Sequence, residues 1–158
     1  MALHEYTVLR LACNAVSIVR DGDALGHLYS PPVLGYEGSS RRERRAIARD
    51  SIIGCYAGMQ AERIYDKNAK DSGGYDDRTA FELSCDYAVT PRRGSRNVDD
   101  EQNLAYLETL RTKSRKLVKR HWPVVQALAA ELLKRKRLDA ESLELLREKL
   151  MPTEKSMP

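Results

Sequence analysis

The stretch from Gly54 to Leu83 constrains the fold most, because a loop with two adjacent glycines joins two helical patterns there. Before the loop, apolar side chains recur at i, i+3, i+4 and i+7, the spacing of a buried helical stripe: Ile52, Cys55, Tyr56 and Met59. Gly73 and Gly74 allow a tight turn, after which Asp76 and Asp77 open the next pattern. We therefore predict a helix, a turn and a second helix whose first turn is acidic.

The first of these helices is predicted to begin at Ser39 or Ser40, because a serine hydroxyl accepts a hydrogen bond from the free amides of a first helical turn. Residues 41–45 are four arginines and one glutamate, so this end of the helix is expected to face solvent. The helix dipole favours acids in a first turn, which gives Asp76 and Asp77 an ordinary structural explanation.

A β-hairpin is predicted ahead of this stretch, since residues 15–20 and 25–30 have the pattern of short strands and Gly22 between them supplies a positive φ. Helical spacing also occurs at residues 2–12 and 99–122, Pro123 can start a further helix, and Asp139 can cap the last one. The predicted fold is mainly α: a single helical domain over residues 1–151 with one small β-hairpin. Residues 152–158 are predicted to be a disordered tail.

Composition excludes several classes of protein. A chain of 158 residues is long enough to bury one core without covalent staples. The three cysteines are too few and too scattered for a disulfide framework, and no apolar run approaches the roughly 20 residues of a membrane helix. We therefore expect a cytoplasmic protein with no membrane partner. No GxxxxGK[ST] phosphate loop occurs, so the chain is not expected to hydrolyse ATP.

The net charge of +4 raises the question of nucleic acid as a partner. Basic residues gather at 41–49, 92–96, 113–120 and 134–137, but acids alternate with them on the predicted helix faces. One Phe and one Trp provide no row of aromatic side chains on which bases could stack. We therefore interpret the basic residues as solvated helix faces and expect no nucleic acid partner.

Four segments, in this order, resemble the peptidase domain of FtsH-type zinc metallopeptidases and their shorter, ATP-independent relatives. They are the His4-Glu5 pair at a helix start, the hairpin VSIVRDGDALGHLYS, the helix end AGMQAERIY, and SGGYDDRTAFELS. The C-terminal LVKRHWPVVQALAAELLKRKRLDAESL looks like the helical tail of the shorter relatives. The resemblance spans nearly the whole chain, and it implies a mostly helical fold with a small hairpin beside a zinc site that acts on a polypeptide.

The resemblance also implies the residues of that site. The family holds zinc with the two histidines of a His-Glu-x-x-His helix and with an aspartate that opens a later helix, which matches His4 and Asp77 here. Histidines at i and i+4 share one helix face, and the motif's glutamate deprotonates a zinc-bound water. Glu5 is the corresponding base if His4 and Glu5 are the first pair of the motif. Glu62, in AGMQAE, matches a glutamate that can orient a ligand histidine by a hydrogen bond.

The sequence departs from the family at this motif. If His4 and Glu5 are its first pair, the second histidine position is Val8, which cannot bind zinc. If His4 is instead the second histidine, Met1 stands at the glutamate position and the first histidine would precede the chain. Either register leaves two protein ligands where a catalytic zinc site needs three, so hydrolysis is predicted to be impaired or absent.

Alternatives stay open at this stage. The chain could be a pseudopeptidase, a non-catalytic module that binds a peptide or protein along the edge of its hairpin. His27 could replace a missing ligand, although a strand histidine is more often a polar surface residue. Glu62 could equally be a surface acid paired with Arg63 or Lys67, and the resemblance allows a homo-oligomer.

Overall fold

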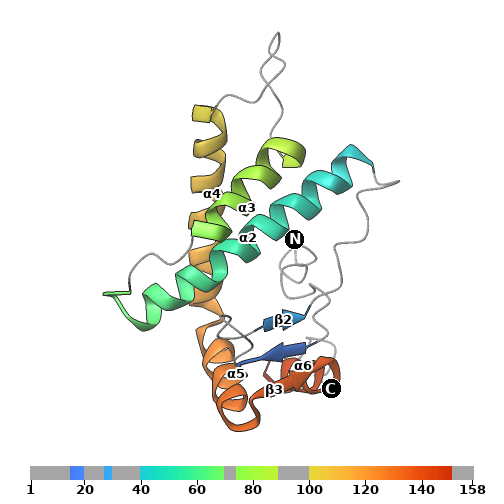
Figure 1. Ribbon diagram of the computed structural model, residues 1–158, viewed down its shortest axis with the longest axis vertical. Helices are drawn as coiled ribbons and strands as arrows, with labels where there is room; N and C mark the ends of the chain where they lie inside the picture. The colour runs from blue at the N-terminus through green and yellow to red at the C-terminus, as the bar shows by residue number, and fades with distance from the viewer. Residues whose placement is uncertain (1–14, 20–26, 30–39, 70–73, 89–99, 151–158) are drawn as a thin grey trace, which may run out of the picture. The chain divides into compact units, whose positions relative to one another are not determined.

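The computed structural model describes residues 15–19, 27–29, 40–69, 74–88 and 100–150 (Figure 1). These residues form five α-helices, one π-helical segment and a small antiparallel sheet, so the prediction of a mainly helical fold is confirmed. The described elements fall into two compact units. One contains helices α2 to α4, and the other contains the sheet and helices α5 and α6.

Helix α2 (Arg41–Tyr65) begins with a complete capping box. The Ser40 hydroxyl accepts a hydrogen bond from the backbone N–H of Glu43 at 3.3 Å, and the Ser40 backbone N–H donates to Glu43 Oε2 at 2.7 Å. Of the two predicted caps, Ser40 is therefore the one used. Hydrogen bonds to the Glu43 carboxylate from the Ser40 side chain and from the Ser40 backbone N–H favour its charged form and lower the pKa of Glu43.

The core of the first unit lies between α2, α3 (Gly74–Leu83) and α4 (Asp100–Arg120), which pack against one another (Figure 1). Three of the four predicted stripe residues are buried and Cys55 is partly buried. The buried apolar cluster consists of Ala48, Ile52, Ile53, Tyr56, Met59, Ala80, Ala88, Leu107 and Leu110. Ser114 joins two of the helices directly, since its hydroxyl donates to the backbone oxygen of Ile53 at 3.0 Å.

A π-helical segment, η2 (Ser84–Ala88), follows α3 directly and was not predicted from the sequence. Its first residue, Ser84, is fully buried and lies 2.5 Å from Asn103 Oδ1 of α4. Asn103 Nδ2 in turn donates to the Cys85 sulfur at 3.1 Å. A buried polar cluster of Ser84, Cys85 and Asn103 therefore ties η2 to α4.

The second unit contains a three-stranded antiparallel sheet in the order β2-β1-β3. Strands β1 (Ala15–Ser17) and β2 (His27–Tyr29) pair with Val16 opposite Leu28, which confirms the predicted hairpin with shorter strands. Strand β3 (Arg137–Asp139), which was not predicted, pairs with the other side of β1.

Two helices flank β3 in the chain, α5 (Trp122–Arg135) and α6 (Ala140–Leu150). Lys136 ends α5 in the left-handed conformation, with φ of 65°, and so turns the chain into β3. Asp139 Oδ1 accepts a hydrogen bond from the backbone N–H of Ser142 at 2.9 Å, which confirms the predicted cap of the last helix. This bond and a second one from the Ser142 side chain lower the pKa of Asp139.

Several sequence predictions are not decided by these elements. The single domain over residues 1–151 stays a prediction, because contacts within each unit do not show whether the two units form one domain. The helix expected at residues 2–12 and the tail at 152–158 lie outside the described residues. Within the described part of the chain, none of the helices combines the length and the hydropathy needed to span a bilayer.

Candidate functional site

The candidate site is built around Asp77, which lies in the first turn of α3 as the sequence predicted. Arg111 Nη2 of α4 donates to Asp77 Oδ1 at 2.8 Å. The Asp77 side chain is 39% exposed and that of Arg111 is 34% exposed, so water reaches both. The bond engages one carboxylate oxygen and links α3 to α4.

Arg111 is held from a second side by Tyr56 of α2. Its guanidinium lies over the tyrosine ring, 4.9 Å from the ring centroid, in the geometry of a cation–π contact. Glu108 Oε2 lies 3.8 Å from Arg111 Nη1 and adds a weaker attraction. Burial opposes the charged guanidinium, but the hydrogen bond from Arg111 to Asp77 and the charge of Asp77 outweigh it, so the pKa of Arg111 is raised.

Cys55 lies on α2 beside this group, on the side of Asp76. Burial of the thiol and the negative charge of Asp76 together raise the pKa of Cys55 to about 11. The thiolate is the form that attacks electrophiles and binds metals. At neutral pH Cys55 is therefore a neutral side chain of the core and not a nucleophile.

At pH 8 the Cys55 thiol is expected to alkylate roughly 100-fold more slowly in the folded chain than in the chain unfolded in urea. The reason is that raising the pKa of Cys55 from 9.0 to about 11 lowers the thiolate fraction by about that factor. Mass spectrometry of iodoacetamide-treated peptides measures both rates at one site, so the unfolded chain is the matched control. The folded-state rate should rise with pH up to about 11. Equal rates in the two states at pH 8 would contradict the burial of this thiol.

The described residues do not complete the zinc site that the resemblance implies. Asp77 is one candidate ligand, but a cation already lies against its carboxylate. Glu62 is exposed near the end of α2, while His4 and Glu5 lie outside the described residues. Within residues that the structure describes, no three His, Cys, Asp or Glu side chains come together as a metal site would require. The described donors alone do not form a zinc site, and we derive no chemical step through the metal.

Two further histidines belong to described elements of the second unit. His27 belongs to β2, where its backbone pairs with Ser17 of β1, and its side chain is outside the described part. His121 is the N-cap residue of α5, and its backbone oxygen accepts hydrogen bonds from Val124 and Val125.

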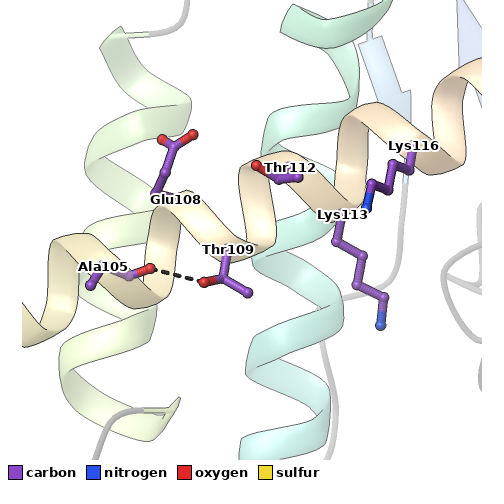
Figure 2. A pocket seen from close by; sticks show the side chains of 6 residues that line it. All are labelled: Ala105, Glu108, Thr109, Thr112, Lys113 and Lys116. Atoms are coloured by element: carbon purple, nitrogen blue, oxygen red, sulfur yellow. Dashed lines mark hydrogen bonds between the residues drawn. The ribbon is translucent and has the colours of Figure 1, made fainter.

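A second surface, the outer face of α4, forms a shallow pocket of about 540 Å³ (Figure 2). It is lined by Ala105, Glu108, Thr109, Thr112, Lys113 and Lys116. Thr109 Oγ1 donates to the backbone oxygen of Ala105 at 3.0 Å, as the dashed line shows, so this hydroxyl already has an acceptor. Glu108 and the lysines carry opposite charges, and the pocket favours no single class of ligand.

Sequence reasoning found Asp77 but missed Arg111 and the role of Tyr56 beside it. Tyr56 was identified only as a core residue, and nothing in the pattern around Arg111 distinguishes it from the other basic residues of α4. Comparison of the chain with protein families and with curated proteins gave no match. The FtsH-type resemblance therefore stays a prediction.

Proposed function

We propose that the chain is a peptidase-like protein of the FtsH type in which zinc-dependent hydrolysis is impaired or absent. The observation that carries this proposal is the pairing of Asp77 with Arg111 at 2.8 Å. Asp77 is the carboxylate expected to complete the zinc site, and a guanidinium in contact with it opposes the approach of a second cation.

Arg111 accounts for only part of the expected loss of zinc affinity. An ion pair as exposed as this one is worth up to about 1 kcal/mol, and a cation–π contact adds about 0.5–1 kcal/mol. Displacing Arg111 would therefore weaken zinc binding by roughly 10-fold, which lowers affinity without abolishing it. The larger loss comes from Val8 or Met1, either of which removes a ligand or the base outright.

A chain that keeps the fold without the chemistry can still bind polypeptide, which is the alternative function. Its support is the sheet order, because β1 pairs on both sides whereas β2 lies at the edge of the described sheet. An extended peptide can add to such an edge through backbone hydrogen bonds, with no metal involved.

The proposal is tested by measuring bound zinc and cleavage of casein with the full chain, after incubation with zinc and gel filtration. We expect less than about 0.1 zinc per chain and no cleavage above background, because too few ligands remain. Asp77→Ala is the control for the ligand and should give the same values. One zinc per chain, together with cleavage that Asp77→Ala abolishes, would overturn the proposal.

The alternative has a separate readout. Fluorescence anisotropy of labelled, unfolded casein reports binding without requiring cleavage. Saturable binding by a chain that does not cleave casein supports the binding module, whereas no binding at micromolar protein concentrations contradicts it.

A further inference from the structure

The N-terminal half of α2 lines a basic pocket of about 670 Å³, which lies within the range of roughly 300–1,000 Å³ found for small-molecule sites. The end of η2 and one residue of α4 complete the lining. Its main residues are Arg41, Arg42, Arg45, Arg49, Ala88 and Tyr106. We refer to these six residues as the arginine pocket.

Helical spacing explains why the arginines gather. Arg41, Arg45 and Arg49 lie at i, i+4 and i+8, so they share one face of α2. Like charges at this spacing cost a helix about 0.2–0.5 kcal/mol per pair, so the arrangement is unfavourable for the helix itself. A ligand of opposite charge would offset that repulsion.

Two acids of α2, Glu43 and Asp50, lie among these arginines in the sequence. Asp50 pairs with Arg49, whose Nε lies 3.0 Å from Asp50 Oδ1. Glu43 is bonded to Ser40 in the capping box, and the Ser40 hydroxyl takes the Glu43 amide. The guanidinium groups, and not the amides of the helix end, are therefore the donors that this pocket offers.

Arg45 is fixed in place by the fold. Its Nε donates to the backbone oxygen of Ala88 at 2.9 Å, which anchors the guanidinium to the end of η2. That bond uses Nε and leaves the two terminal nitrogens to face a ligand. A pre-oriented guanidinium loses less conformational entropy on binding than a mobile one.

Tyr106 supplies the wall from α4 and is partly buried. Its burial raises the pKa of the phenol, while the charges of Arg49 and Arg45 act in the opposite direction. Both guanidiniums and the ring line the same pocket, and the phenol stays neutral at physiological pH. The neutral ring gives the arginine pocket one apolar side.

We propose that the arginine pocket binds a small ligand carrying two or more phosphate groups. The planar fork of each guanidinium matches phosphate oxygens, and several such groups around one cavity match several negative charges. A single tyrosine and a cavity of limited size favour a small molecule over single-stranded nucleic acid, which is bound along extended grooves with successive aromatic residues. This proposal is independent of zinc and of peptidase activity.

Isothermal titration calorimetry with sodium tripolyphosphate in 150 mM salt tests the proposal on the full chain. We expect saturable binding at one site by the wild-type chain. The double variant Arg42→Gln/Arg45→Gln removes two donors from the pocket and should bind roughly 10- to 100-fold more weakly. The matched control Arg44→Gln/Arg63→Gln removes the same charge from the same helix outside the pocket, and its affinity should change by less than about 3-fold.

Three results of the titrations would overturn the proposal: no saturable binding by the wild-type chain, equal weakening in the two double variants, or tighter binding of a single-stranded oligonucleotide than of tripolyphosphate.

Because Arg45→Gln removes the bond to Ala88, amide NMR of the wild-type chain provides a second measurement that needs no variant. Shifts induced by tripolyphosphate should fall on residues 41–49, Ala88 and Tyr106. Shifts confined to other residues would also contradict the proposal.

Discussion

Replacing Tyr56 by alanine is expected to lower the free energy of unfolding by about 3–5 kcal/mol, the cost of removing a large aromatic side chain from a packed core. Tyr56 is 1% exposed and, among the described residues, is the largest fully buried side chain. Its ring also supports the Arg111 guanidinium, which would lose its cation–π contact. Because domains are stable by only about 5–15 kcal/mol, this change removes a large fraction of the total. Urea denaturation followed by circular dichroism measures it.

Two controls separate burial from other effects of the substitution. Tyr65→Ala makes the same change at the end of the same helix, where the side chain is 85% exposed, and should change stability by less than about 0.5 kcal/mol. Tyr56→Phe keeps the ring and should cost less than about 1.5 kcal/mol. A loss below about 1 kcal/mol for Tyr56→Ala would show that this side chain is not part of the core.

Local patterns predicted α2 well because the signals that define it lie within a few residues of one another. Ile52, Tyr56 and Met59 are buried as their spacing predicted, and the cap at Ser40 is completed by Glu43, three residues later. The hairpin was also predictable, since β1 and β2 are close in the chain.

Elements that depend on distant partners could not be predicted in this way. Strand β3 has three residues, of which only Leu138 is apolar, and its extended conformation is stabilised by pairing with β1 at the other end of the chain. The π-helical segment η2 reads in sequence as a continuation of α3. Its Ser84 contacts Asn103, nineteen residues away, and no local pattern indicates this contact.

The candidate site likewise combines a residue that the sequence indicated with one that depends on a distant contact. Asp77 was identified from the resemblance to the FtsH-type domain, in which an aspartate opens a later helix. Arg111 lies 34 residues away, and only the packing of α3 against α4 brings the two together. The arginines at 41–49 were interpreted as a solvated face. The structure adds Ala88 and Tyr106, which turn part of that face into a pocket.

Replacing Asn103 by alanine is the second change for which a large effect is expected, about 2–3 kcal/mol of lost stability. Asn103 is fully buried and contacts both Ser84 and Cys85. Truncation leaves a cavity and removes two hydrogen bonds, each worth about 1 kcal/mol. The Ser84 hydroxyl keeps the backbone oxygen of Phe81 as an acceptor at 2.8 Å, whereas the partly buried Cys85 sulfur loses its amide donor. Urea denaturation measures the loss, and Leu104→Ala, at an exposed position one residue further along α4, is the matched control.

Asn103→Leu distinguishes the hydrogen bonds from the volume, because leucine fills a similar space without polar atoms. If the bonds are the larger contribution, this variant should still lose about 1–3 kcal/mol, since both hydrogen bonds of Asn103 are lost and only Ser84 keeps another partner, the backbone oxygen of Phe81. Thiol reactivity provides an independent readout. Burial, together with the charges of Asp86 and Asp100, raises the pKa of Cys85, and loosening η2 should let this thiol alkylate faster. Wild-type stability and an unchanged alkylation rate in Asn103→Leu would mean that the polar cluster does not hold η2 against α4.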